Sequence, residues 1–240
     1  YMSKDTINIE FINPDQNFFY NDNAKQYFGT IFPLETYYKS NKQTFRKELL
    51  PILYQNNTYK WSNDEMLKIK EYIENAIEIL QDQECYILSN LSWKLVKLSH
   101  KIEWGYPFTI GDTIILPNDD INFVTNSEEI QQEFINTLIH EQIHVFQKAN
   151  LEIFDNFYVN NWNWIPNQRI NIRSADKERI VHNPDGMDIR WIWKCPDTDE
   201  YVFQSLYLQP TVKKENSFKD KIIERRWILL EAETYGKRTL

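Results

Sequence analysis

Apolar residues recur every three or four positions over residues 62–83, which is the spacing of one face of a helix. Ser62 and Glu65 fit a capping box, in which each side chain bonds the backbone N–H of the other residue. The same spacing returns over residues 217–235, and Gly236 fits a C-terminal stop. We therefore predict a long helix at 62–83 and a helix that closes the chain.

A further helix is predicted over residues 125–150. Thr125 and Glu128 fit a capping box at its start, and Asn150 fits a C-terminal stop. The apolar positions follow helical spacing, and they are Ile130, Phe134, Leu138, Ile139, Ile143 and Phe146. This pattern predicts an amphipathic helix with one face in the core.

Two extended segments are predicted between the helices at 62–83 and 125–150. Residues 93–98 alternate imperfectly between apolar side chains and lysines, as expected of a strand. Residues 107–117 form a second extended run that ends at Pro117. This order of elements predicts a small mixed sheet packed on the helix at 125–150.

Residues 151–210 are predicted to hold an inserted β-hairpin. A turn signal, Asn-Pro-Asp-Gly at 183–186, precedes alternating apolar and polar residues over 187–194, and residues 201–208 fit the returning strand. Half of the eight tryptophans of the chain fall in this region, namely Trp162, Trp164, Trp191 and Trp193. Side chains of this kind suit either the wall of a cleft or a surface that binds a partner.

Residues 1–58 are rich in aromatic side chains, and we predict that they form an N-terminal layer packed on the core. The aromatic residues are Phe18, Phe19, Tyr20, Tyr27, Phe28, Phe32, Tyr37 and Tyr38. A chain of 240 residues can bury the core of one domain. We therefore predict a single α+β domain over residues 1–240.

Composition and charge exclude several classes of protein. The mean hydropathy of −0.61 and the 15% of aromatic residues are typical of a soluble globular chain, and no stretch approaches the roughly 18 apolar residues of a membrane span. A net charge of −8 argues against nucleic-acid binding, which needs clustered Lys and Arg. Cys85 and Cys195 make no disulfide framework and the N-terminus lacks an apolar leader, so we expect an intracellular protein.

The chemistry-bearing motif is His140-Glu141-Gln142-Ile143-His144, within the predicted helix at 125–150. Residues four apart share a helix face, so His140 and His144 present two imidazoles to one metal ion. Glu141 flanks that metal and can take a proton from water. Because the chain has only four histidines, this spacing predicts a zinc site.

The motif and the order of elements over residues 62–150 resemble those of the zincin metallopeptidases. This resemblance implies a zincin-like fold and hydrolysis of peptide bonds with zinc as the cofactor. In that superfamily an edge strand pairs with an extended peptide substrate. By analogy residues 113–116 would be the substrate-binding strand, and an ordinary interior strand is the alternative.

Catalytic zinc takes three protein ligands, so a third ligand is needed. The chain lacks the third histidine that metzincins place shortly after His144. Resemblance to the gluzincin branch implies a glutamate on a later helix, and residues 231–235 partly match the Glu-x-x-Ala-Asp pattern of that branch. Glu231 is our choice because it shares a predicted helix face with Ile223 and Trp227. The alternatives are Glu224, Glu200 and His182.

The resemblance also implies a residue that supports the oxyanion, and the candidates are His182, Tyr201 and Tyr235. The chain is thus expected to be a zinc-dependent endopeptidase with Glu141 as general base and acid, acting on a peptide or protein and on neither nucleic acid nor membrane. One alternative is a catalytically silent zincin-like protein whose Trp-rich hairpin binds a partner. A metal hydrolase with a different substrate is a third possibility.

Overall fold

The computed structural model describes residues 7–123, 127–162, 164–166, 176, 178–182, 184–185, 191–194, 201–207 and 223–229. Contacts divide the chain into two compact units. Unit 1 comprises Tyr1–Ile31 and Thr36–Leu151, and unit 2 comprises Phe32–Glu35 and Glu152–Leu240. The prediction that residues 1–240 act as one catalytic domain stays a prediction.

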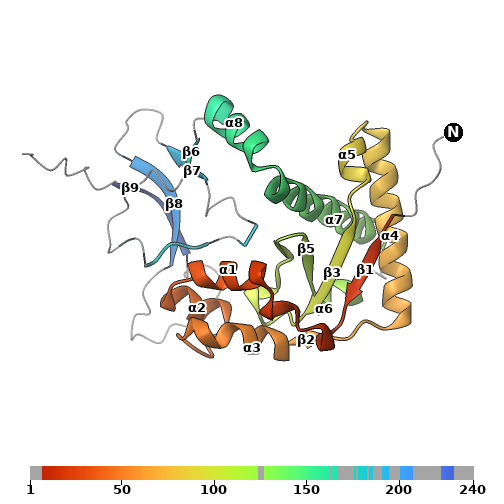
Figure 1. Cartoon of the computed structure of the whole chain (residues 1–240), viewed down its shortest axis with the longest axis horizontal. Coiled ribbons are helices and arrows are strands. Elements are labelled where there is room, and N and C mark those ends of the chain that lie inside the picture. Colours follow the sequence, from red (N-terminus) through yellow and green to blue (C-terminus); the bar gives the residue numbers. More distant parts are fainter. Residues whose placement is uncertain are drawn as a thin grey trace, which may run out of the picture. The chain divides into compact units, whose positions relative to one another are not determined.

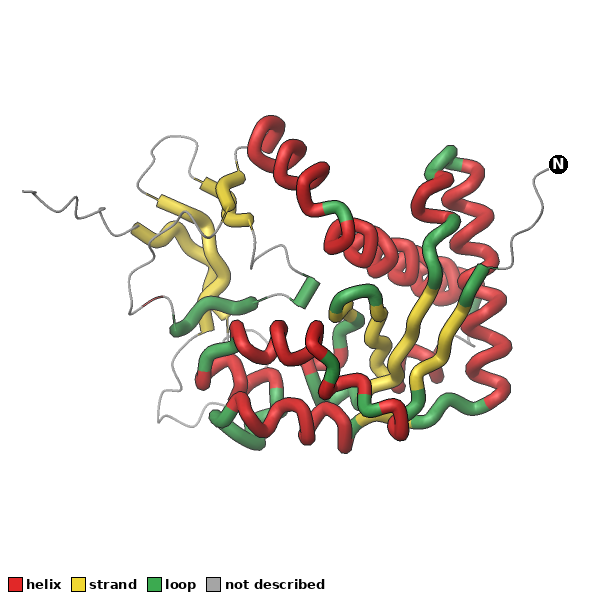
Figure 2. Tube along the Cα trace, in the orientation of Figure 1, coloured by secondary structure: helices red, strands yellow, loops and turns green. Residues whose placement is uncertain are grey.

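Unit 1 combines helices with a small sheet (Figures 1 and 2). Its strands are β1 (Ile9–Ile12), β2 (Thr58–Tyr59), β3 (Trp93–Leu98), β4 (Phe108–Ile110) and β5 (Thr113–Pro117). Its helices are α1 (Asp22–Thr30), α2 (Pro33–Lys39, whose first residues belong to unit 2), α3 (Leu50–Asn56), α4 (Asn63–Asp82), α5 (Tyr86–Ser89), α6 (Asn118–Phe123) and α7 (Glu128–Ala149). Short 3-10 helices lie at Pro14–Gln16, Phe18–Tyr20, Lys47–Leu49 and Glu103–Gly105.

The sheet of unit 1 is mixed, with the order β1-β3-β5-β4. Strands β1, β3 and β5 are parallel, β4 is antiparallel to β5, and β2 pairs with the end of β3. Successive β3 side chains face opposite sides, so Trp93 and Leu95 join a core with α4 and α7, whereas Val96 and Leu98 join a second core with α1 and α3. The sheet is therefore covered on both faces (Figure 1), which explains why β3 alternates so imperfectly in sequence.

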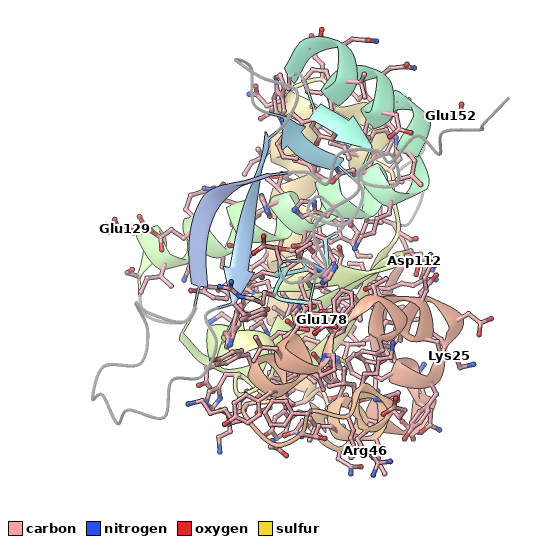
Figure 3. All side chains as sticks on the ribbon, turned by 90° about the vertical axis from the view of Figure 1, so that its left-hand side faces the viewer. Lys25, Arg46, Asp112, Glu129, Glu152 and Glu178 are labelled. Carbon is pink, nitrogen blue, oxygen red and sulfur yellow. The ribbon has the colours of Figure 1, made fainter. Side chains whose placement is uncertain are left out.

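The helices that were predicted at 62–83 and 125–150 are present as α4 and α7. In α4 the capping box of Ser62 and Glu65 is confirmed, because each backbone N–H donates to the other side chain. In α7 the N-cap is Ser127, whose hydroxyl accepts from the N–H of Ile130. The predicted start at Thr125 was therefore wrong, since α7 begins three residues later; Glu129, labelled in Figure 3, lies in its first turn.

The run predicted at 107–117 is a hairpin of two short strands, β4 and β5. Gly111 and Asp112, the latter labelled in Figure 3, form the turn between them. Gly111 has a φ of 60°, a conformation that glycine adopts without steric cost. Strand β5 lies between β3 and β4, so residues 113–116 form an interior strand and the predicted substrate-binding role of this segment was wrong.

The N-terminal aromatic layer is confirmed for most of its residues. Phe18, Phe19, Tyr27 and Phe28 are buried in the core with α1 and α3, whereas Tyr20 is exposed. A buried polar cluster lies within this layer. The carboxylate of Glu103 accepts hydrogen bonds from the hydroxyls of Tyr27 and Tyr54 and pairs with the ammonium of Lys39.

Unit 2 contains α8 (Leu151–Trp162) and a four-stranded antiparallel sheet of β6 (Trp164–Pro166), β7 (Trp191–Lys194), β8 (Tyr201–Tyr207) and β9 (Ile223–Leu229). The predicted hairpin is confirmed, because β7 pairs with β8. The prediction of a helix at 217–235 was wrong for residues 223–229, because these residues form β9 and pair with β8. A spacing of four residues places side chains on one face of a strand as well as of a helix, so the apolar pattern did not distinguish the two.

The fold class is thus α+β with a small mixed sheet packed on α7, as predicted. The expectation of a zincin-like fold stays a prediction. Within the described ranges, no helix is both long and apolar enough to cross a membrane.

Candidate metal centre

Helix α7 brings the two histidines of the motif together. The Nε2 atoms of His140 and His144 lie 3.0 Å apart, and their ring centroids are 4.6 Å apart. His144 is buried, whereas His140 is exposed. The pair therefore offers one fixed imidazole and one that solvent can reach.

The tautomer of His144 follows from its contact with Gln147. Nδ1 of His144 lies 3.0 Å from Oε1 of Gln147, and both side chains are buried. An amide oxygen only accepts, so Nδ1 of His144 carries the hydrogen. In the neutral ring Nε2 then has a lone pair, and the hydrogen bond between the two Nε2 atoms is donated by His140.

This geometry fits a divalent zinc ion. Two nitrogens bound to one tetrahedral zinc at about 2.0–2.1 Å lie about 3.3 Å apart. The observed 3.0 Å between the Nε2 atoms is close to that spacing. Neutral imidazole is a preferred zinc donor, and the hydrogen bond from the far ring nitrogen is the usual support for such a ligand.

Glu141 lies between the two histidines in sequence and is only 3% exposed. Carboxylates are rarely buried to this extent without a charged or hydrogen-bonding partner. A buried carboxylate is the kind of group that can transfer protons to and from water if a metal binds nearby. The structure therefore brings His140 and His144 into contact and buries Glu141 on the same helix.

The end of α7 contacts the edge of the sheet. Nζ of Lys148, one turn beyond His144, donates to the backbone oxygen of Thr109 at 2.7 Å and to the Thr109 hydroxyl. Ile110 and Thr113 flank a two-residue turn, so they form a hydrogen-bonded pair of the antiparallel ladder. Hydrogen-bonded and non-hydrogen-bonded pairs alternate, so the carbonyl of the preceding residue, Thr109, points away from β5. This outward carbonyl of the edge strand β4 therefore accepts a hydrogen bond from Lys148 of α7.

The structure does not locate a third ligand. Glu231, Glu200 and Tyr235 lie outside the described residues. Glu224 belongs to β9 and not to a helix. The helix-face argument for Glu231 has lost its basis, because Ile223 and Trp227 are strand residues. No group of three or more His, Cys, Asp or Glu residues suited to a metal occurs in the part of the chain that the structure describes.

His182 is buried in unit 2 against Glu35. Its backbone N–H donates to Oε1 of Glu35 at 2.8 Å, and its Nδ1 lies 2.7 Å from Oε2. The ring also packs on Phe32. A carboxylate at Nδ1 fixes the orientation of an imidazole, as in many functional histidines. Tyr201 is the first residue of β8, and the catalytic roles of His182 and Tyr201 stay predictions.

Sequence reasoning missed several residues of this region, and a signal existed for some of them. Gln147 and Lys148 follow His144 by three and four positions, so they share its helix face. Glu35 is 147 residues from His182, and no local pattern connects them. No family model, curated protein or solved structure matches the chain.

Proposed function

We propose that this protein is a zinc-dependent metallopeptidase with a zincin-like fold. The observation that carries the proposal is the convergence of the His140 and His144 Nε2 atoms at 3.0 Å on the helix that also carries the buried Glu141. Support comes from a mixed sheet packed on that helix, with an antiparallel edge strand beside it. The substrate class is a peptide or protein.

In the proposed reaction His140 and His144 hold zinc through their Nε2 atoms. Bound zinc supplies a Lewis acid that acidifies water and polarises a carbonyl. Glu141 accepts a proton from the attacking water and returns it to the departing amine. Burial of Glu141 and His144 lowers the polarity of their surroundings and so strengthens the electrostatic interactions of these two side chains.

The first test is metal content. Protein purified without a tag and supplied with zinc should hold about one zinc per chain by mass spectrometry. His140→Ala and His144→Ala should each remove most of it, whereas Glu141→Gln should retain it. Glu231→Ala and Glu224→Ala, measured beside them, identify or reject the predicted third ligand. Parent protein without zinc after this treatment would refute the proposed site.

The second test is hydrolysis of unfolded proteins and peptide libraries. Glu141→Gln should lower the rate at least about 100-fold, because it removes the general base and keeps the shape. A variant as active as the parent would refute the role of Glu141. Zinc bound by a parent that cleaves nothing would favour the binding-protein alternative. Its surface would then include the exposed Phe157 and Trp162 of α8.

A further inference from the structure

We propose that Gln147 is a positioning residue that holds His144 in the Nδ1–H tautomer and so directs its Nε2 lone pair at the metal position. This inference adds a residue to the function proposed above and rests on it for the metal. The observation is the 3.0 Å contact between Nδ1 of His144 and Oε1 of Gln147. Both residues lie on α7, three positions apart, so one helix supplies the ligand and its support.

Burial gives this hydrogen bond its influence. Gln147 is 2% exposed, and His144 is 9% exposed. In such surroundings a polar group left without a partner costs more than it does in water, so each side chain restricts the other. Gln147 turns its amide oxygen, and not its NH₂ group, toward Nδ1 of His144, and an oxygen acceptor at this position favours the ring tautomer that carries its hydrogen on Nδ1. Gln147 therefore decides the tautomer of His144.

The tautomer of His144 also determines which ring donates the hydrogen bond between the two histidines. With Nδ1 of His144 protonated, the hydrogen in the contact between the two Nε2 atoms comes from His140. Metal binding must replace that hydrogen, because a ligating nitrogen needs its lone pair. His140 is exposed and can exchange its hydrogen with water. We therefore expect zinc to move the hydrogen of His140 from Nε2 to Nδ1 and to leave the tautomer of His144 unchanged.

The chain offers a matched control on the same helix. Gln142 is also buried, at 1% exposure, but its Nε2 donates to the backbone oxygen of Ser92 at 3.2 Å and not to a histidine. Methionine has nearly the shape of glutamine and no strong acceptor. Gln147→Met and Gln142→Met thus each remove one buried amide from α7, and only the first removes the support of His144.

The deciding measurement is ¹⁵N NMR of the imidazole rings in the full chain without metal. The parent and Gln142→Met should show His144 with hydrogen on Nδ1 and His140 with hydrogen on Nε2. Gln147→Met should lose this preference at His144, and Gln147→Glu should restore it because a carboxylate also accepts. An unchanged His144 tautomer in Gln147→Met would overturn the proposal.

Zinc affinity measured by competition with a chelator gives a second readout. Gln147→Met should bind zinc about 10–100-fold more weakly than the parent, which is the usual effect of losing the support of a ligand. Gln142→Met should stay within about twofold, and Gln147→Glu should match or exceed the parent. Equal losses in the two methionine variants would show a general effect of packing and overturn the positioning role.

The two readouts separate this inference from the proposed function. A parent that binds no zinc, yet shows the expected tautomers and their loss in Gln147→Met, would refute the metallopeptidase and uphold the positioning of His144 by Gln147. A parent that binds zinc with a His144 tautomer independent of Gln147 would uphold the metal site and overturn the inference.

Discussion

Lys97 is a buried cation whose partner lies on a different element of unit 1. From β3 its Nζ donates to both carboxylate oxygens of Glu65 on α4 at 2.7 Å, and it lies 5.4 Å from the ring centroid of Trp61. Burial raises the pKa of the Glu65 carboxyl, but hydrogen bonds from Lys97 and Ser62 outweigh it, so the pKa lies below its ordinary value of 4.5. This ion pair ties α4 to the sheet.

The lowered pKa of Glu65 predicts a stability that depends on pH. A carboxyl with a lower pKa in the folded chain stabilises it above the unfolded pKa of about 4.5, and this contribution disappears as pH falls through the folded pKa. Glu65→Gln keeps a side chain suited to the capping box and should lose about 1.5–3 kcal/mol at pH 7. Urea unfolding at several pH values should show this difference from the parent shrinking below about pH 4.5.

A second lysine of β3 supplies the control for Glu65→Gln. Lys94 pairs with Asp112 at the same 2.7 Å, but the two side chains are 32% and 57% exposed. Exposed ion pairs contribute little, so Asp112→Asn should lower the unfolding free energy by less than about 1 kcal/mol. Equal losses in the two variants would contradict the importance of burial for the Lys97 pair.

The motif residues could be predicted from sequence because their geometry is local. Helical spacing alone brings His140 and His144 to one face, and the structure shows them in contact. Gln147 satisfies the same local rule and was within reach of sequence reasoning. The contact of His182 with Glu35 depends on how distant segments pack, which no spacing in the chain encodes.

Among the elements, the turn between β4 and β5 depends most on one residue. Gly111 has a φ of 60°, and a Cβ atom there would lie 2.2 Å from Nδ2 of Asn23 at the start of α1. Gly111→Ala should therefore lower the unfolding free energy by about 1–3 kcal/mol, through backbone strain and the displaced Asn23 side chain. Thermal and urea unfolding of the full chain measure this loss.

Gly29 provides the matching control for that substitution. It lies in α1, and a Cβ atom would meet nothing within 4 Å. Because alanine favours a helix more than glycine does, Gly29→Ala should be neutral or stabilise by up to about 1 kcal/mol. A loss at Gly29 as large as at Gly111 would show that the turn conformation is not the cause.

Most elements with a local signal were predicted well, whereas strand β9 was not. Strand β3 matches residues 93–98, and α4 begins after the predicted cap at Ser62. The β4–β5 turn was missed although a Gly-Asp pair between apolar runs is a hairpin signal. Strand β9 is set by its pairing with β8 from Tyr201 to Tyr207, a tertiary contact that the local apolar spacing does not reveal, because that spacing fits a helix and a strand alike.

The division of the chain into two units could not be predicted from its amino-acid composition, because aromatic residues are abundant in both units. The two proposed ligands, His140 and His144, belong to α7, whose buried side chains, including Phe134 and Leu138, form part of the core of unit 1. If His140 and His144 bind zinc as proposed, metal binding is connected to the folding of this core. A metal that binds only the folded chain adds its binding free energy to stability.

Zinc should therefore stabilise this protein in proportion to its occupancy. At a free zinc concentration of about 100 times Kd, the unfolding free energy of the parent should rise by about 2.7 kcal/mol. Glu141→Gln should show the same rise because Glu141 is not a ligand in the proposed site, whereas His140→Ala and His144→Ala should show almost none. Urea unfolding with zinc and with a chelator measures these differences. A rise that persists in both histidine variants would place the stabilising metal elsewhere, because neither variant retains the pair of Nε2 atoms that defines this centre.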